Sequence, residues 1–264
     1  MNDAIPLRLG FLGTGAITSA IVTGLAASGM PCRICVSPRN ARVAGRLAET
    51  FPIVSVAASN QALLDCSDVI LIAVRPQVVA DVLAAVRFRP DHRVLSLVAA
   101  VSKDSIAGLV HPAATVACAV PLPTVANRSG ATAIYPPDPV AEQLFDRLGT
   151  AIPVASEREF QAIFASTAVI ASFFTFLDAI SVWLTEHQVP EPRARTYIAS
   201  MFDGLTGLAE ATEVPFADLV REFSTKGGLN EQYAALLAQA GAFDACSRGL
   251  DAVLRRIEDQ RRNA

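Results

Sequence analysis

The first 155 residues alternate short apolar runs with segments whose apolar positions repeat at helical spacing. The apolar runs are rich in β-branched residues and predict strands at 7–13, 33–37, 53–56, 69–74, 94–98, 115–120, 132–135 and 151–154. The strand at 132–135 is expected at an edge of the sheet, because Pro136 and Pro137 close it. Strands that alternate with helices at this spacing indicate βαβ units and a doubly wound sheet.

The segments between these strands predict helices at 16–27, 39–49, 61–65, 76–86 and 140–148, the fourth opening on Pro76. Beyond Ser156 no convincing strand pattern remains, and the chain predicts helices near 157–187, 191–212, 215–223, 229–239 and 242–262. We therefore expect an α/β fold class with two domains. Residues 1–155 form a Rossmann-type doubly wound sheet, and residues 156–264 form an all-helical domain.

One helical segment leaves two interpretations open. The 18 residues from Phe160 to Leu177 carry no formal charge, which reaches the lower limit for a membrane span. The segment contains several polar side chains, and Asp178 follows it directly. These features favour a helix in a subunit interface, and hence a homodimer or higher homo-oligomer with no membrane partner.

Composition narrows the class of protein. The chain has 264 residues, of which 52% are hydrophobic and 18% charged, so intrinsic disorder is excluded. A net charge of −3 gives no broad basic field for nucleic acid. Only Lys103 and Lys226 are lysines among the 22 basic residues. The first residues show no signal-peptide pattern, so we expect a cytoplasmic enzyme.

The cysteines and histidines suggest neither a metal site nor a catalytic pattern. Five dispersed cysteines argue against a disulfide framework. Cys32 and Cys35 lie in a predicted strand, where positions i and i+3 point to opposite faces, so both are interpreted as structural core residues. His92, His111 and His187 are scattered, and we interpret each as a surface or capping residue.

A glycine pattern marks a nucleotide site where the first strand meets the first helix. In Gly10-Phe-Leu-Gly13-Thr-Gly15, Gly13 permits a tight turn and Gly15 lets the backbone approach a pyrophosphate. The helix that follows offers free N–H groups and a positive dipole end. Thr18 stands where a third Gly or Ala is usual, and an ordinary glycine-rich turn is the alternative. The predicted cofactor contacts here are Gly10, Leu12, Gly13, Thr14, Gly15, Ala16 and Ile17.

The tip of the second strand indicates which cofactor binds. NAD enzymes place an acidic residue there for the ribose 2′-hydroxyl, but no acid occurs between Gly10 and Glu49. Ser37 and Arg39, with Arg42 one turn further, instead suit a 2′-phosphate. NADPH is therefore predicted in preference to NADH. In the alternative interpretation, the two arginines are solvated helix residues.

Several motifs together resemble the pyrroline-5-carboxylate reductase family. They are Gly10-Phe-Leu-Gly-Thr-Gly, Ser37-Pro-Arg, Ala73-Val-Arg-Pro-Gln77, Ser96-Leu-Val-Ala-Ala-Val101, Pro121-Leu-Pro-Thr124, Gly130-Ala-Thr-Ala-Ile-Tyr-Pro136 and Gly227-Gly228. The resemblance implies a Rossmann domain followed by a helical dimerisation domain, and a site between two subunits. It also implies that Ala73, Val74, Arg75 and Pro76 lie along the cofactor.

The chain departs from this family where substrate is expected to bind. The family's Met-Pro-Asn-Thr-Pro is Val120-Pro-Leu-Pro-Thr124 here, and its Ser-Pro-Gly-Gly-Thr-Thr, which holds the substrate carboxylate, is Thr225-Lys-Gly-Gly-Leu-Asn230. The resemblance assigns Pro121, Gly227, Gly228 and Leu229 to substrate binding. Lys226 and Asn230 are the candidate catalytic residues, because a cation and an amide there can hold a carboxylate. Arg75 and Arg128 are weaker candidates that could contact cofactor phosphate instead.

Three functions remain open at this stage. The first is NADPH-dependent hydride transfer to the C=N bond of a small cyclic imino acid, converting pyrroline-5-carboxylate to proline. The second is reduction of a different imine or a carbonyl on the same scaffold, with Lys226 as acid or anion anchor. The third is a nucleotide-sensing module without catalysis. A β-hydroxyacid dehydrogenase is disfavoured, because 157–187 lacks the lysine that such enzymes carry in that helix.

Overall fold

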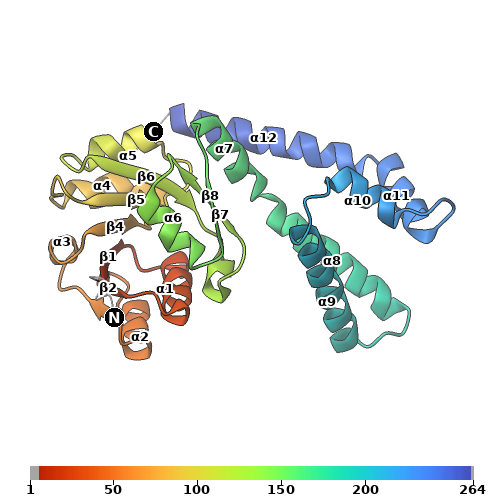
Figure 1. The fold of residues 1–264 in the computed structure, drawn as a ribbon, viewed down its shortest axis with the longest axis horizontal. Coiled ribbons are helices and arrows are strands. Elements are labelled where there is room, and N and C mark those ends of the chain that lie inside the picture. Colours follow the sequence, from red (N-terminus) through yellow and green to blue (C-terminus); the bar gives the residue numbers. More distant parts are fainter. Residues whose placement is uncertain (1–5, 263–264) are drawn as a thin grey trace. The chain divides into compact units, whose positions relative to one another are not determined.

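The computed structural model describes residues 6–262 and contains one eight-stranded sheet (Figure 1). The strands are β1 (Leu7–Leu12), β2 (Cys32–Val36), β3 (Val54–Val56), β4 (Val69–Ile72), β5 (Arg93–Ser96), β6 (Thr115–Val120), β7 (Ala131–Tyr135) and β8 (Thr150–Pro153). Their order is β3-β2-β1-β4-β5-β6-β7-β8. Strands β1 to β6 are parallel, whereas β7 runs antiparallel to β6 and parallel to β8. The doubly wound sheet is thus confirmed.

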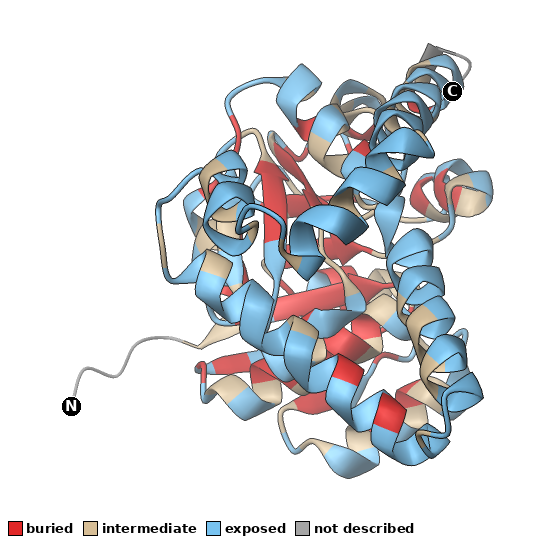
Figure 2. Ribbon diagram, turned by 90° about the vertical axis from the view of Figure 1, so that its right-hand side faces the viewer, coloured by how far each residue is buried: buried red, intermediate tan, exposed pale blue. Residues whose placement is uncertain are grey.

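Helices cover both faces of this sheet. One apolar core joins the sheet to α1 (Ala16–Ser28), α2 (Ala41–Thr50), α6 (Pro139–Asp146) and the 3₁₀ turn η2 (Pro123–Asn127). A second core joins it to α3 (Asn60–Asp65), α4 (Val79–Ala84) and α5 (Lys103–Leu109); the 3₁₀ turn η1 (Pro76–Val78) precedes α4. Buried residues concentrate in the strands between these layers (Figure 2). Cys32 and Cys35 belong to opposite cores, which confirms their structural interpretation.

Two local expectations differ from the structure. The strand at 132–135 is not at an edge, because β8 pairs with β7 on its outer side and leaves β3 and β8 as the edges. The Pro136-Pro137 pair instead ends β7 and leads into α6. Helix α5 was not predicted, because Ile106 is its only buried residue and the apolar spacing is therefore faint. Its signal is Ser102, whose hydroxyl caps the helix by accepting from the Ser105 N–H at 2.9 Å.

From Glu157 onward the described chain contains six helices. They are α7 (Glu157–Ser166), α8 (Val169–Glu186), α9 (Glu191–Glu210), α10 (Phe216–Phe223), α11 (Leu229–Gln239) and α12 (Ala242–Arg262). The helix expected over 157–187 is therefore interrupted between Ser166 and Val169. Helix α7 begins with a capping box, in which Ser156 Oγ accepts from the Glu159 N–H and the Glu159 carboxylate accepts from the Ser156 N–H.

The contacts divide the chain into two compact units. One contains the sheet and runs to Phe164, with the chain from Arg255 returning to it, and the other spans Ala165–Leu254. The start of α7 and the end of α12 belong to the sheet unit, where Phe160 and Ile257 are buried and Glu157 pairs with Arg261. The expected boundary at residue 155 lies nine residues before Phe164, and the end of α12, expected in the helical domain, belongs to the sheet unit.

The helical unit exposes much of its apolar surface. Helix α8 has no buried residue, and Phe174 and Trp183 are 62% and 55% exposed. The helical run Glu157–Glu186 is long and apolar enough to cross a membrane by length and composition. A cavity of about 660 Å³ in this unit is lined by Phe176, Ala179, Ile180, Trp183, Tyr233 and Leu237. This surface requires a partner, because apolar area of this kind is seldom left in water.

Candidate functional site

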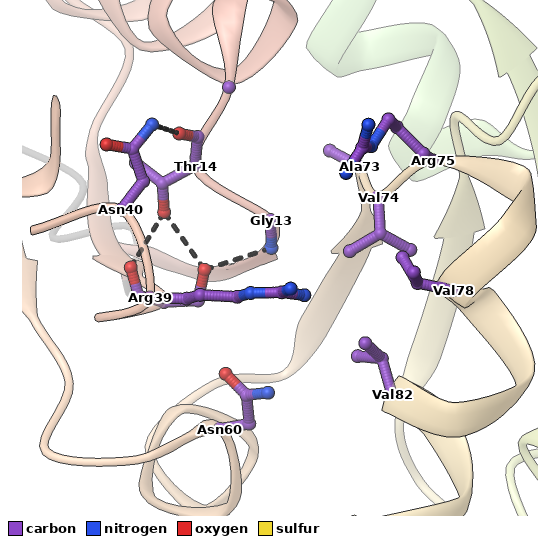
Figure 3. A pocket seen from close by; sticks show the side chains of 12 residues that line it. Gly13, Thr14, Arg39, Asn40, Asn60, Ala73, Val74, Arg75, Val78 and Val82 are labelled. Carbon is purple, nitrogen blue, oxygen red and sulfur yellow. Dashed lines mark hydrogen bonds between the residues drawn. The ribbon is translucent and has the colours of Figure 1, made fainter.

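A cavity of about 370 Å³ opens at the carboxyl ends of β1, β2 and β4 (Figure 3). Strands β1 and β4 are neighbours in the sheet but not in sequence, so the cavity lies at the switch point where doubly wound sheets bind ligands. Its lining residues are Gly13, Thr14, Gly15, Ser37, Arg39, Asn40, Asn60, Ala73, Val74, Arg75, Val78 and Val82. Eight of the thirteen predicted cofactor contacts are among them.

The glycine turn after β1 has the properties that a dinucleotide site requires. Gly13 has a φ of +106°, and a Cβ there would lie 2.4 Å from the Ala73 carbonyl oxygen. Both the backbone conformation and the lack of space therefore require glycine at this position. A Cβ on Gly15 would meet no atom within 4 Å, which leaves the backbone open for a ligand. The unusual Thr18 is also explained, because its buried hydroxyl donates to the Gly13 carbonyl at 2.6 Å.

A hydrogen-bond network joins this turn to the tip of β2 (Figure 3). The Thr14 hydroxyl donates to the Ser37 carbonyl at 2.8 Å, and the Asn40 side-chain amide donates to the Thr14 carbonyl at 3.0 Å. Ser37 Oγ accepts from the Gly13 N–H at 3.0 Å and lies 2.9 Å from Thr14 Oγ1. Since the Thr14 proton is already used, the Ser37 hydroxyl donates to Thr14 Oγ1. Ser37 therefore lines the cavity and also supports the glycine turn.

The charges around the cavity favour an anionic ligand. Arg39 and Arg75 line it, and none of the twelve lining residues is acidic. The Arg39 side chain extends across the cavity from the β2 side toward Val78 (Figure 3). Arg42 is not a lining residue and is exposed in α2. The residues present thus fit a phosphorylated dinucleotide: an open glycine turn, the first turn of α1 beside it, and two guanidinium groups.

The other predicted cofactor contacts lie near the cavity without lining it. A Cβ on Gly10 would lie 2.6 Å from both Leu63 Cδ2 and Ser67 Oγ, so this glycine lets α3 approach β1. Leu12 is buried in the core. Ala16 and Ile17 open α1, and Pro76 opens η1.

Four lining residues were missed by the sequence analysis. Asn40 caps α2 by accepting from the Val43 N–H, and Asn60 opens α3 directly after Ser59, which caps that helix. Val78 and Val82 are four residues apart, so they share one helical face after Pro76. Capping residues and helical spacing could have predicted where these side chains lie in their helices. Their residue types, however, do not indicate that they bind a cofactor.

The turn expected to bind substrate lies in the helical unit between α10 and α11. Gly227 has a φ of +73°, and its N–H donates to Glu231 Oε2 at 2.7 Å. The Gly228 N–H donates to the Thr225 carbonyl at 2.8 Å, and the Asn230 side-chain amide donates to the Phe223 carbonyl at 2.9 Å. Lys226 and Leu229 are exposed. The backbone N–H groups of Gly227 and Gly228 and the Asn230 amide therefore each have an acceptor in this turn or in the helices that flank it.

The remaining candidates occupy separate places. Pro121 follows β6 and does not line the cavity. Arg128 reaches back to α1, where its Nη1 donates to the Ala27 carbonyl at 3.4 Å. His111 is exposed, and the exposed His187 ends α8, with its Nδ1 2.7 Å from the Trp183 carbonyl.

His92 is buried rather than on the surface, and this corrects the sequence-based interpretation. Its Nδ1 accepts from the Arg89 N–H at 3.0 Å, so its Nε2 carries the proton that the Leu64 carbonyl accepts at 3.1 Å. Burial, reinforced by the Arg89 charge, lowers the pKa of His92. For Cys118, whose charged form is the thiolate, burial instead raises the pKa to about 12, as expected for a core thiol.

Two family models match the two halves of the chain. Residues 8–100 match the family described as NADP oxidoreductase coenzyme F420-dependent. Residues 157–260 match the pyrroline-5-carboxylate reductase dimerisation family. The second match covers the helices whose apolar surface lacks a partner, and it supports an interface between subunits rather than a membrane span.

Similar proteins point to the same family. A pyrroline-5-carboxylate reductase from Pseudomonas aeruginosa is 28% identical over 251 residues, covering 90% of each chain. A 1-pyrroline-5-carboxylate reductase structure from Streptococcus pyogenes matches 97% of this chain and 100% of its own, with a TM-score of 0.84 and 19% identity. A Plasmodium falciparum pyrroline carboxylate reductase with NADP bound matches 97% and 98%, with a TM-score of 0.82 and 14% identity. The chain therefore belongs to the pyrroline-5-carboxylate reductase family and is an NAD(P)-dependent oxidoreductase of that family.

Proposed function

We propose that this protein uses NADPH to reduce the C=N bond of a small cyclic imino acid, with pyrroline-5-carboxylate as substrate and proline as product. The observation that carries the cofactor choice is the acid-free tip of β2, where Arg39 crosses the cavity and no lining residue is acidic. A carboxylate at this tip would oppose a 2′-phosphate, whereas a guanidinium attracts it.

The chain's residues contribute positioning and charge. When bound, NADPH supplies the hydride, and a protonated imine needs no strong acid to accept it. The Gly13–Gly15 turn and the first turn of α1 hold the pyrophosphate, Arg39 binds the 2′-phosphate, and Ala73–Arg75 border the cofactor. Lys226, together with the turn at 225–230, attracts the substrate carboxylate. Because the cofactor supplies the hydride and the protein supplies positioning and charge, few catalytic side chains are needed, in agreement with the sequence.

A second candidate function has a specific observation in its favour. The Gly227 and Gly228 N–H groups donate to Glu231 and Thr225, and one N–H of the Asn230 amide donates to the Phe223 carbonyl at the end of α10. Leu229 presents an apolar side chain beside them. These features favour a different imine or a carbonyl substrate, reduced on the same scaffold. In that case Lys226 serves as the acid or the anion anchor.

We further propose that the protein works as a soluble homodimer in the cytoplasm. The dimerisation-family match and the exposed apolar face of α8 support this assembly. The cavity lined by Trp183 and Tyr233 provides an apolar surface against which side chains of a second copy can pack.

The decisive experiment follows oxidation of NADPH with pyrroline-5-carboxylate, other cyclic imines and keto acids, with NADH measured in parallel. The proposal expects turnover with pyrroline-5-carboxylate and a higher kcat/KM with NADPH than with NADH. Turnover only with keto acids would support the carbonyl alternative. Tight NADPH binding without turnover on any substrate would instead indicate the nucleotide-sensing module.

A further inference from the structure

The turn before α11 already holds a carboxylate of its own chain. Glu231 Oε2 accepts the hydrogen bond of the Gly227 N–H at 2.7 Å, within the short range of charge-assisted bonds. Gly227 has a φ of +73°, so the backbone conformation that directs this N–H depends on glycine. Glu231 is the third residue of α11, where the positive end of the helix dipole also favours a negative charge.

The neighbouring donors of this turn are similarly engaged. The Gly228 N–H donates to the Thr225 carbonyl, and a Cβ on Gly228 would lie 2.5 Å from Thr225 Oγ1, so the turn is closed tightly around this bond. The Asn230 amide donates to the Phe223 carbonyl. Leu229, 83% exposed, adds apolar surface beside them. A substrate carboxylate that approaches Gly227 therefore meets a carboxylate already bound there.

We propose that Glu231 is a specificity-determining residue that occupies the anion position of this turn. Its carboxylate competes with a substrate carboxylate for the Gly227 N–H and repels that second anion. Glu231 consequently reduces the advantage that a cyclic imino acid has over the same imine without a carboxylate. This inference rests on the proposed function, because it assumes that the turn binds the substrate. Lys226 attracts an anion from the same turn, so Lys226 and Glu231 act in opposite directions on the same substrate group.

The size of the effect follows from the exposure of the site. A negative charge about 4 Å from a substrate carboxylate in a water-like dielectric weakens the binding of that carboxylate about fivefold, and more where water is excluded. Glu231→Gln removes the charge while it keeps an oxygen that can accept the Gly227 N–H. Glu231→Ala removes both the charge and the acceptor. Glu210→Gln, in α9 of the same unit, makes the same charge change at an exposed position outside the turn.

The test compares 1-pyrroline-5-carboxylate with 1-pyrroline, two imines that differ only in the carboxylate. We expect Glu231→Gln and Glu231→Ala to raise the ratio of their kcat/KM values in favour of the carboxylate at least about fivefold, through a lower KM. We expect Glu210→Gln to keep the wild-type ratio. An unchanged or lowered ratio in both Glu231 variants, with wild-type circular dichroism and NADPH affinity, overturns the inference.

A binding measurement separates this inference from the proposed function. Calorimetry of L-proline with the NADP⁺-saturated protein reports the anion position without turnover, and Glu231→Gln should lower its Kd at least about fivefold. An equal Kd in wild type and variant contradicts the role of Glu231. Absence of NADPH oxidation with either imine contradicts the proposed function instead, whatever the calorimetry shows.

Discussion

Replacing Arg39 with alanine is expected to remove most of the preference for NADPH. The guanidinium extends into the cavity from an exposed position, so its attraction for a phosphate is screened by water. One unit charge at about 4 Å in water contributes about 1 kcal/mol. A phosphate monoester carries roughly −1.5 to −2 charges at neutral pH, which raises the attraction to about 2 kcal/mol. Because 1.4 kcal/mol corresponds to a factor of ten, the loss is about 10- to 30-fold.

The assay is a titration of NADPH and NADH fluorescence with wild type, Arg39→Ala and Arg42→Ala. Arg42→Ala is the matched control, because it removes the same charge three residues away at a position that does not line the cavity. We expect the ratio of the NADH and NADPH dissociation constants to fall about 10- to 30-fold in Arg39→Ala and to stay near wild type in the control. High salt should shrink the wild-type preference, because the screening length falls from about 10 Å at 0.1 M to about 3 Å at 1 M.

Two results would refute this reasoning. If Arg39→Ala weakens both cofactors by the same factor, Arg39 contacts a group that NADH also carries, such as the pyrophosphate. If Arg42→Ala lowers the ratio as much as Arg39→Ala does, the preference arises from the general positive charge of this region rather than from a contact in the cavity.

Three further predictions address other parts of the molecule. Lys226→Met should raise KM for pyrroline-5-carboxylate about tenfold and leave kcat nearly constant, because a charge-assisted hydrogen bond is lost; a fall in kcat at constant KM would place Lys226 in proton transfer instead. Light scattering should show a dimer that Phe174→Glu dissociates, since Phe174 is 62% exposed on α8; a wild-type monomer at micromolar concentration refutes the interface. The free energy of unfolding should decrease as pH falls below 6.5, the ordinary pKa of histidine, because the unfolded His92 takes up a proton that the buried ring resists. Denaturant titrations should show a weaker decrease in His92→Gln, and an unchanged pH dependence would contradict the assignment.

The sheet could be predicted from the sequence because its strands are apolar runs and most of them are separated by segments with helical spacing. The glycine turn places the cofactor cavity at β1, whereas the order of the strands is a finding of the structure. Helix α5 is not predicted, because it buries a single side chain, Ile106, and its sequence therefore has almost no apolar periodicity. The edge assignment of β7 failed for a different reason. A proline pair after a strand shows where the strand ends, but pairing on its outer side depends on β8, which lies beyond α6.

The candidate site was predictable only in part, because residue type does not reveal which partner a polar group will choose. The sequence predicts that Ser37 contacts the cofactor phosphate, but it does not reveal that the same hydroxyl hydrogen-bonds to Gly13 and Thr14 in the glycine turn. The sequence predicts that Asn230 holds a carboxylate, but it does not reveal that its amide also donates to the Phe223 carbonyl. Glu231 carried no motif and was not considered. The contact that gives it importance arises from the α11 capping geometry, which depends on the conformation of Gly227.

The network of Thr14, Ser37 and Asn40 has a consequence for how this protein could change its coenzyme. In dinucleotide enzymes an acidic residue at the tip of the second strand binds the ribose 2′-hydroxyl of NAD, whereas a nearby arginine accommodates the 2′-phosphate of NADP. Here Ser37 is buried and also supports the glycine turn, so an acidic residue at that position would lose the proton that Ser37 donates to Thr14 Oγ1 and place a charge in the interior. A switch toward NADH, whether by engineering or by natural drift, is therefore expected to arise at the exposed Arg39 while Ser37 is retained.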